Sequence, residues 1–397
     1  MTALPPAAST AQLNAAAGAT FLVFGINGLV FASWAARIPA VAELLHVTSG
    51  QLGTLLLCLA LGSLIALPTA GLVVGRIGTA STVRAAGLVA AVAGVAVALA
   101  LLAASVPGTA IALFVFGIGI GLWDVSQNVE GADVEHRLGR TIMPQFHAAF
   151  SGGAFLGALI GAGLSNLGVG LPAHLLVIAA VVAVVAMLAP RYFLPHLPAA
   201  APVAGEAREN GRSAWRDGRT LLIGAVVLGA TLTEGAGNDW IAKAAVDGLG
   251  ASQSAGALLF AAFVLAMTAM RFFGGRAIDA YGRVAVLRAS MGAAAAGLAL
   301  FVLAGNIWLA TAGAALWGVG AALTFPVGMS AAADDPKRAA ARVSVVSTIG
   351  YIAFLAGPPL LGYLGDVTGI RPALLAIGVP ILAALLLAGA AKPLRTR

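Results

Sequence analysis

The feature that most constrains this chain is a series of long apolar segments, each long enough to cross a lipid bilayer as a helix. A spanning helix needs about 20 apolar residues, and twelve segments of the 397-residue chain meet this length. They lie at roughly 17–38, 50–74, 82–104, 108–132, 142–166, 171–193, 219–243, 252–276, 282–304, 307–331, 340–364 and 371–391. Only 9% of the residues are charged, too few to cover a water-soluble protein of this size. The sequence therefore predicts an all-α integral membrane protein with twelve transmembrane helices.

One polar stretch near the middle of the chain separates the apolar segments into two sets of six. Residues 194–218 are rich in Pro, Ala, Gly and Arg and show no apolar period, which is typical of a flexible connector. We predict an N-terminal six-helix bundle at residues 1–193, a cytoplasmic linker at 194–218 and a C-terminal six-helix bundle at 219–397. The first fifteen residues lack Lys and Arg, and we expect them to form a short tail before the first helix.

The distribution of Lys and Arg predicts the orientation of the helices. If the N-terminus lies in the cytoplasm, all but three of the 22 Lys and Arg residues fall on the inner side. The three outer cations are Arg37, Lys243 and Arg371. Cytoplasmic loops of membrane proteins carry such an excess of cations, so we predict that both termini are cytoplasmic. A basic inner face beside anionic lipid also explains the net charge of +7 without a nucleic-acid partner.

The two halves of the chain carry similar motifs at an offset of about 205 residues. The segment from Ser33 to Arg37 ends in Trp-Ala-Ala-Arg, and the segment from Asp239 to Lys243 ends in Trp-Ile-Ala-Lys. The glycine-rich inner segment at 71–78 likewise parallels residues 275–283. A nearly constant offset between such matches indicates an internal repeat.

On these motifs the sequence resembles the major facilitator superfamily, whose members consist of two six-helix halves. In that family the inner loop after the second helix carries a Gly-x-x-x-Asp-Arg-x-Gly-Arg-like motif. The second copy here keeps the glycines, Asp279 and Arg283, whereas the first copy has Gly75 at the acid position and Thr79 at a basic position. The resemblance implies a gating role for Arg276, Asp279 and Arg283, and it leaves the first loop without the same charges.

Within the superfamily, the chain is most similar to an uncharacterised bacterial inner-membrane group related to fucose–proton symporters. The residues that carry this resemblance are Ser33 to Pro39, Asp124 with Asn128, His147 to Gly153, and Glu234 to Trp240. The resemblance implies a multi-pass protein of the bacterial cytoplasmic (inner) membrane that acts as a monomer. Drug antiporters of the family have an arginine where this chain has Val115 and Phe116. This difference disfavours a multidrug role.

Two acids lie deep inside predicted membrane helices. Polar side chains in such segments are costly and usually face a cavity or a partner. Asp124 lies near the middle of the fourth predicted helix and Glu234 near the middle of the seventh, so each half contributes one embedded carboxylate. We predict that these two acids couple proton movement to solute movement, because embedded carboxylates of this kind can exchange protons during a functional cycle.

Other polar and aromatic residues at similar depth are candidates for binding the solute or for gating. The predicted solute-binding residues are Asn27, Trp123, Gln127, Asn128, His147, Asn238, Trp317 and Tyr351. The predicted gating residues are Arg37, Asp239, Arg276, Asp279 and Arg283. Permanent pairing is the alternative for the charged residues. It would join Asp239 to Arg37, or Glu130 to His147.

These features predict a secondary active transporter that moves a small polar, sugar-like solute by alternating access and couples this movement to protons. Proton-driven efflux of amphipathic compounds is the alternative transport function. A membrane-embedded receptor or enzyme is the alternative outside transport. No nucleophile or metal-ligand set stands at a working spacing, so we expect no enzyme, no cofactor and no metal. The expected partners are the small-molecule solute, protons and the lipid bilayer.

Overall fold

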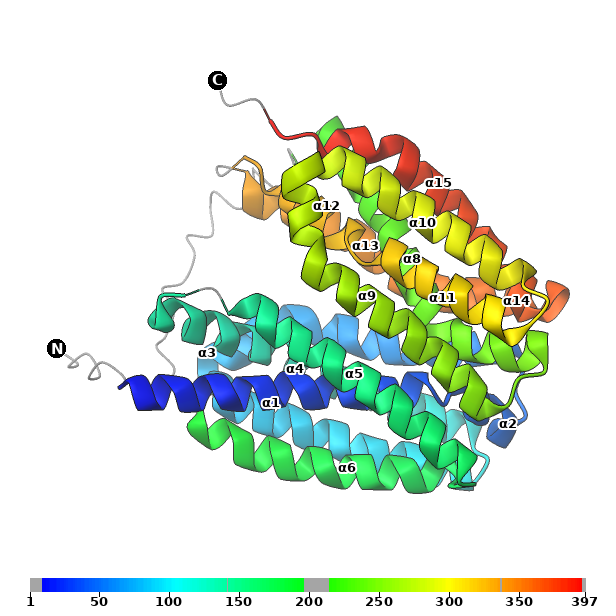
Figure 1. The fold of residues 1–397 in the computed structure, drawn as a ribbon. Helices are drawn as coiled ribbons and strands as arrows, with labels where there is room; N and C mark the ends of the chain where they lie inside the picture. The colour runs from blue at the N-terminus through cyan, green and yellow to red at the C-terminus, as the bar shows by residue number, and fades with distance from the viewer. Residues whose placement is uncertain (1–8, 141, 196–213, 336–337, 395–397) are drawn as a thin grey trace. The chain divides into compact units, whose positions relative to one another are not determined.

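The computed structural model describes residues 9–140, 142–195, 214–335 and 338–394, and every regular element within these ranges is helical (Figure 1). The N-terminal half has α1 (Thr10–Ala35), α2 (Ile38–Leu45), α3 (Ser49–Leu102), α4 (Val106–Leu138), α5 (Met143–Asn166), α6 (Leu171–Leu188) and the 3-10 helix η1 (Ala189–Tyr192). The C-terminal half has α8 (Gly218–Leu249), α9 (Gln253–Tyr281), α10 (Arg283–Leu303), α11 (Ile307–Ala321), α12 (Thr324–Ala332), α13 (Ala339–Thr368), α14 (Ile370–Ala373), η2 (Leu374–Ile377), α15 (Gly378–Leu387) and η3 (Ala388–Ala391). Most of the predicted linker lies outside the described residues.

Eleven helical stretches in the described part of the chain are long and apolar enough to cross a membrane. One of them, α3, has 54 residues. Its length is about 80 Å at the rise of an α-helix, more than twice the hydrocarbon thickness of a bilayer. The backbone of α3 leaves helical geometry at Gly78, where φ is 79° and ψ is 165°. Glycine tolerates this positive φ because it has no Cβ, and the break divides α3 into two spans. The described residues therefore contain the twelve spans that the sequence predicts.

The first helix begins earlier than the sequence-based expectation. α1 starts at Thr10, so the expected tail through Ala15 is wrong. The reason is a capping box at its N-terminus, in which the backbone N–H of Ser9 donates to Oε1 of Gln12 at 2.8 Å. The backbone N–H of Gln12 donates in return to Oγ of Ser9 at 3.3 Å. These bonds satisfy donors that a helix start leaves unpaired, so the helix continues beyond the apolar segment.

Two helices of the C-terminal half differ from expectation in their continuity. The tenth predicted span is broken at Ala322 and Leu323, between α11 and α12. In contrast, α13 stays helical through Pro358 and Pro359, although an internal proline usually bends or breaks a helix. Membrane helices tolerate internal prolines when neighbouring groups satisfy the freed backbone carbonyls. The break between α11 and α12 lies just before Pro326, which cannot donate to the carbonyl of Ala322 four residues earlier.

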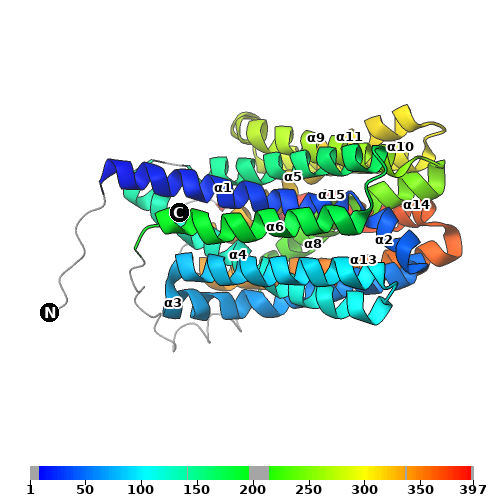
Figure 2. The ribbon, with the colours of Figure 1, turned by 90° about the horizontal axis from the view of Figure 1, so that it is seen from below.

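The described residues cluster into two compact units. The first comprises the described parts of residues 1–34, 58–157 and 170–200, and the second those of 35–57, 158–169 and 201–397. The two units do not coincide with the two halves of the sequence. α2 and the first nine residues of α3 lie in the N-terminal half but belong to the second unit. The long helices of the first unit run alongside one another (Figures 1 and 2).

The first unit is built around α1, which has an apolar core on each of two faces. On one face, α3, α4 and α6 pack around the fully buried Trp123, together with Ala90 and Ile178. On the other, the rings of Phe24 and Phe146 stack at a centroid distance of 5.6 Å where α4 and α5 join the core. This arrangement leaves the polar residues of α4 and α5 at the edges of the two cores.

A row of glycines brings α5 against the backbone of α1. A Cβ added at Gly153 would lie 1.8 Å from the carbonyl oxygen of Gly25, and one at Gly157 would lie 2.5 Å from that of Leu29. Both distances are shorter than any real Cβ contact. Small residues let membrane helices approach this closely, so these glycines are packing residues.

The second unit is arranged around α8. This helix packs against α9, α11, α12, α13 and α15. α10 and α11 also pack closely, since a Cβ added at Gly297 would lie 2.2 Å from the backbone nitrogen of Trp317. The short α2 contacts α8 as well. α8 therefore carries its embedded polar residues, including Glu234, at the centre of the second unit.

Candidate functional site

A polar cluster lies in the middle of α4 in the first unit. Asp124 accepts hydrogen bonds through Oδ1 from Nε2 of Gln127 at 3.1 Å and from Nδ2 of Asn128 at 3.4 Å. Asn128 also donates to the backbone carbonyl of Asp124 at 2.8 Å. Residues three and four apart share one face of a helix, which explains why these three side chains meet. Gln127 is fully buried, whereas Asp124 is exposed on the surface of the unit.

His147 extends this cluster from α5. Its imidazole lies within electrostatic range of the carboxylate of Asp124. The imidazole packs edge-on against Phe24 of α1 at a centroid distance of 5.3 Å. Asn27 lies one turn further along α1, fully buried, and its Nδ2 has no hydrogen-bond partner among the described residues. A buried amide of this kind calls for an acceptor such as water or a bound solute.

The two tryptophans predicted to bind solute are both packing residues in this structure. Trp123 is fully buried in the apolar core of the first unit. Trp317 is also fully buried, and its Nε1 donates to the carbonyl of Thr233 at 3.1 Å. The rings of Phe263 and Phe301 lie 5.8 Å and 6.0 Å from the ring of Trp317. Helix packing and this hydrogen bond account for Trp317 without a ligand. Nε1 of Trp123 is buried and has no hydrogen-bond partner among the described residues.

An ion pair lies in the middle of the second unit. Nη2 of Arg271 on α9 contacts Oε2 of Glu234 on α8 at 2.8 Å. The Nε of Arg271 donates to the carbonyl of Ala322 at 3.2 Å. Ala322 is the C-cap of α11, where the helix breaks, so its carbonyl can accept from a side chain. The break between α11 and α12 therefore anchors the cation that faces Glu234.

The sequence did not single out Arg271 as a site residue. It counted only as one of the inner-side cations, although it lies five residues inside the predicted span at 252–276. A cation within a spanning segment is a functional signal in its own right. Its partner could not be identified, because pairing with Glu234 depends on the packing of α9 against α8.

Three other predicted site residues belong to the second unit, two on α8 and one on α13. Asn238 is one turn beyond Glu234 on α8, and its buried Oδ1 has no hydrogen-bond partner in the described part of the chain. Asp239 follows it on the neighbouring face of α8 and is partly exposed. Tyr351 on α13 is 36% exposed, and its ring lies 6.4 Å from that of Phe354.

The structure gives Arg37 and Glu130 hydrogen-bond partners other than those of the two permanent pairs considered as alternatives. Arg37 donates to the carbonyls of Gly161 at 3.4 Å and Val169 at 3.0 Å, where it binds the C-terminal end of α5 instead of Asp239. The buried Glu130 accepts from Oγ1 of Thr79 at 2.5 Å and from the backbone N–H of Leu194 at 2.8 Å. Backbone groups and a hydroxyl are therefore the partners of Arg37 and Glu130, for which the sequence suggested charged partners.

Arg283 of the inner-loop motif belongs to an ionic cluster at the ends of the helices in the second half. Asp334 contacts Arg283 at 2.6 Å and Arg219 at 2.8 Å, and Arg283 also donates to Ser330 at 3.1 Å. Partial burial raises the pKa of Asp334, but the hydrogen bonds and charges of the two arginines outweigh it, so the pKa lies below its ordinary value. The two other predicted gating residues of this loop, Arg276 and Asp279, are exposed.

The first half has a counterpart of this cluster that contains no arginine. Thr79 and Glu130 precede Arg283 and Asp334 by the same offset of about 204 residues. Their side chains meet through one hydroxyl–carboxylate hydrogen bond instead of an ion pair. The two copies of the motif thus differ in the bond at equivalent positions, which is a hydrogen bond in the first half and an ion pair in the second.

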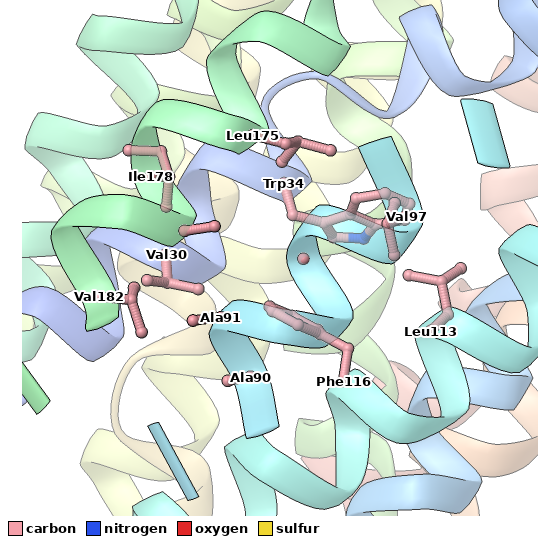
Figure 3. Close-up of a pocket in the computed structure, with 12 residues that line it drawn as sticks. Val30, Trp34, Ala90, Ala91, Val97, Leu113, Phe116, Leu175, Ile178 and Val182 are labelled. Atoms are coloured by element: carbon pink, nitrogen blue, oxygen red, sulfur yellow. The ribbon is translucent and has the colours of Figure 1, made fainter. Parts of the chain in front are cut away.

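An apolar pocket in the first unit is separate from these polar groups (Figure 3). Trp34, Phe116 and Leu113 contribute to its lining, with residues of α3 and α6 closing the other sides. The cavity volume is about 20 Å³, room for about one water molecule. No titratable side chain lines it. The pocket is therefore a packing gap and a poor site for a polar solute.

Sequence comparison identifies relatives along almost the entire chain. The family model described as Major Facilitator Superfamily matches residues 228–397. The chain is 34% identical over 371 residues to the uncharacterized transporter y4wD of Sinorhizobium fredii, covering 90% of this chain and 96% of that protein. It is 31% identical over 357 residues to an uncharacterized MFS-type transporter of Yersinia pestis, covering 89% of this chain and 90% of that protein.

Solved structures with low sequence identity share the same architecture. The nucleoside transporter NupG matches with a TM-score of 0.72 at 14% identity, covering 94% of this chain and 98% of that chain. The E. coli fucose:proton symporter FucP matches with a TM-score of 0.60 at 16% identity, covering 95% of this chain and 100% of that chain. At such identities the likeness shows the fold alone.

Proposed function

Because the chain belongs to the major facilitator superfamily, we propose that it moves a small polar, sugar-like solute across the bacterial inner membrane by alternating access, coupled to protons. In this proposal residues 1–193 and 219–397 form the two six-helix bundles, residues 194–218 link them, and both termini are cytoplasmic. One observation carries the proposal: each unit holds a hydrogen-bonded polar cluster in the middle of its spanning helices. Polar groups at this depth are costly and are kept for function.

The solute site is formed from the cluster of the first unit. Asp124 and His147 are exposed on that unit, while Gln127 and Asn128 hold the carboxylate in place. Amide and carboxylate groups can accept from and donate to the hydroxyls of a neutral solute. Asn27 contributes a further donor from α1. The two structural neighbours, a nucleoside transporter and a fucose:proton symporter, agree with a polyhydroxylated solute.

Asp124 and Glu234 have different parts in proton coupling. Asp124 has amide partners, so its proton and the solute can exchange on the same carboxylate. Glu234 is held by Arg271, so protonation of Glu234 would release the guanidinium to other acceptors. The pair therefore converts a change of protonation into a change of contact between α8 and α9. Efflux of amphipathic compounds has less support, because the groups in both clusters are polar and charged.

The solute can be identified by a screen of chemically distinct compound classes. Purified protein is screened by thermal shift against neutral sugars, polyols, nucleosides, organic acids and amphipathic cations at two pH values. A bound solute stabilises the native state by mass action. We expect stabilisation by a neutral polyhydroxylated compound, and loss of that shift in Asn128→Ala. Stabilisation by amphipathic cations alone would contradict the proposed solute class.

Proton coupling is then tested by uptake into proteoliposomes with an imposed pH gradient. We expect Asp124→Asn and Glu234→Gln to lose the dependence of uptake on the gradient. The matched control is Asp247→Asn, which alters an acid at the exposed end of α8 that pairs with Lys243. Gradient-driven uptake that survives unchanged in both Asp124→Asn and Glu234→Gln would refute the coupling role of these acids.

A further inference from the structure

The start of α3 and the end of α13 meet in the second unit, although they come from opposite halves of the sequence. Thr48 is the cap of α3 and forms a capping box with Gln51. Its backbone N–H donates to Oε1 of Gln51 at 3.0 Å, and the N–H of Gln51 donates to Oγ1 of Thr48 at 3.3 Å. These bonds pair two of the donors at the helix start. The hydroxyl proton of Thr48 and the N–H of Gly50 remain to be paired.

Asp366 of α13 accepts both remaining donors. Its Oδ2 lies 2.8 Å from Oγ1 of Thr48 and 3.1 Å from the N–H of Gly50. A carboxylate is favoured at this position because the N-terminus of a helix carries a partial positive charge. Hydrogen bonds to ionised acceptors are also stronger than neutral ones. One side chain from the C-terminal half thus completes the cap of a helix in the N-terminal half.

The backbones beside this cap are in direct contact. A Cβ added at Gly53 would lie 2.4 Å from the carbonyl oxygen of Pro358, and one at Gly362 would lie 2.3 Å from that of Ser49. Oγ1 of Thr54 and the hydroxyl of Tyr363 lie 3.2 Å apart. The approach of α3 to α13 therefore depends on glycines, since the ring of Tyr363 also lies directly against Gly50.

The composition of this contact suits an interface that opens and closes. Asp366, Thr48 and Thr54 are all exposed or at its rim. A second polar contact, between Gln253 on α9 and Glu43 on α2, joins the same two halves of the sequence at 2.5 Å. Hydrogen bonds at an exposed rim can be exchanged for bonds to water at small net cost. A permanent interface would more often bury an apolar core.

We propose that Asp366, Thr48 and Gly50 form a latch that holds the first turn of α3 to the end of α13 and must release for the outer side of the transporter to open. This role rests on the alternating access proposed above. In that topology both helix ends lie on the side that carries few cations. Release removes the carboxylate from the α3 cap, and water then satisfies the freed N–H and hydroxyl groups.

The latch is tested by measuring the separation of two labelled helices, with no solute required. Cysteines replace Leu44 of α2 and Trp308 of α11 in a Cys58→Ala background, because both positions are exposed and neither belongs to the latch. Double electron–electron resonance between nitroxides at these cysteines reports the distance distribution. We expect one main distance with the latch intact. In Asp366→Ala, a longer distance gains population on the order of tenfold, since hydrogen bonds to a charged group are lost.

Two further variants separate the latch from general damage to the fold. Thr48→Val removes the hydroxyl that donates to Asp366 and accepts from the N–H of Gln51, and it should produce a smaller shift in the same direction. Thr48→Ser keeps the hydroxyl and should match the unmodified protein. Unchanged distance distributions in both Asp366→Ala and Thr48→Val would overturn the latch. A shifted distribution in a protein that transports none of the tested solutes would instead uphold the latch and contradict the proposed function.

Discussion

The ion pair between Glu234 and Arg271 offers a quantitative test of the site in the second unit. The side chains of Arg271 and Glu234 are 33% and 19% exposed, so the pair is neither a surface ion pair nor a fully buried one. Exposed pairs contribute about 0–1 kcal/mol, and breaking a buried pair costs about 3–5 kcal/mol. We therefore expect a coupling energy of about 1–2 kcal/mol between the two side chains.

The individual variants should differ in a way that follows from their partners. Arg271→Ala loses the ion pair and also the hydrogen bond to the carbonyl of Ala322, so it should cost about 2–3 kcal/mol of unfolding free energy. Glu234→Gln keeps an oxygen that can accept from Arg271 and should cost about 1 kcal/mol. Arg288→Ala removes an exposed cation on α10 and serves as the matched control, with a change within about 0.5 kcal/mol.

The assay is a double-mutant cycle with Glu234→Ala, Arg271→Ala and the double variant, unfolded by denaturant in detergent. The double variant should be destabilised by less than the sum of the single variants, with the difference equal to the coupling energy. Strict additivity in the cycle would refute the ion pair and the exchange of contacts inferred from it.

Three further predictions concern packing and charge elsewhere in the chain. Gly153→Ala should destabilise the protein by about 1–3 kcal/mol, because the new Cβ would meet the carbonyl of Gly25 at 1.8 Å. Gly152→Ala, whose Cβ meets nothing within 4 Å, should be near neutral in the same unfolding assay. Asp334→Asn should destabilise at neutral pH. Because the folded-state pKa of Asp334 is depressed, its stabilising effect is present above the ordinary carboxyl pKa and is lost as the pH falls through the folded-state value. Unfolding curves of Asp334→Asn and the unmodified protein should therefore converge in acid. Trp317→Phe should cost about 1–2 kcal/mol through the lost hydrogen bond and packing, with solute affinity retained in the thermal-shift assay.

The membrane architecture could be predicted from the sequence because its physical cause is local. The length of each apolar segment is compared with a fixed bilayer thickness, so composition alone identifies most spans. Helix ends are harder, since they depend on single hydrogen bonds such as those between Ser9 and Gln12. Ala322 is itself neither glycine nor proline, but Pro326 lies four residues later. A proline cannot donate to the carbonyl four residues before it, so this spacing is the sequence signal of the break.

The candidate site was only partly predictable for a related reason. The cluster on α4 follows from helical spacing, which places Asp124, Gln127 and Asn128 on one face. The partner of Glu234 lies 37 residues away on another helix, and pairing across helices depends on their packing. The binding of Arg37 to backbone carbonyls also could not be predicted from the sequence, because every residue has a carbonyl and no residue type marks the acceptor.

Proton movement during solute transport is the most direct test of the proposed function. Lightly buffered proteoliposomes receive a solute identified in the thermal-shift screen, and the external pH is recorded without an imposed gradient. The mechanism predicts that addition of the solute makes the external medium more alkaline, and that Asp124→Asn abolishes this change while Asp247→Asn retains it. Solute uptake with no accompanying proton movement in the unmodified protein would contradict it.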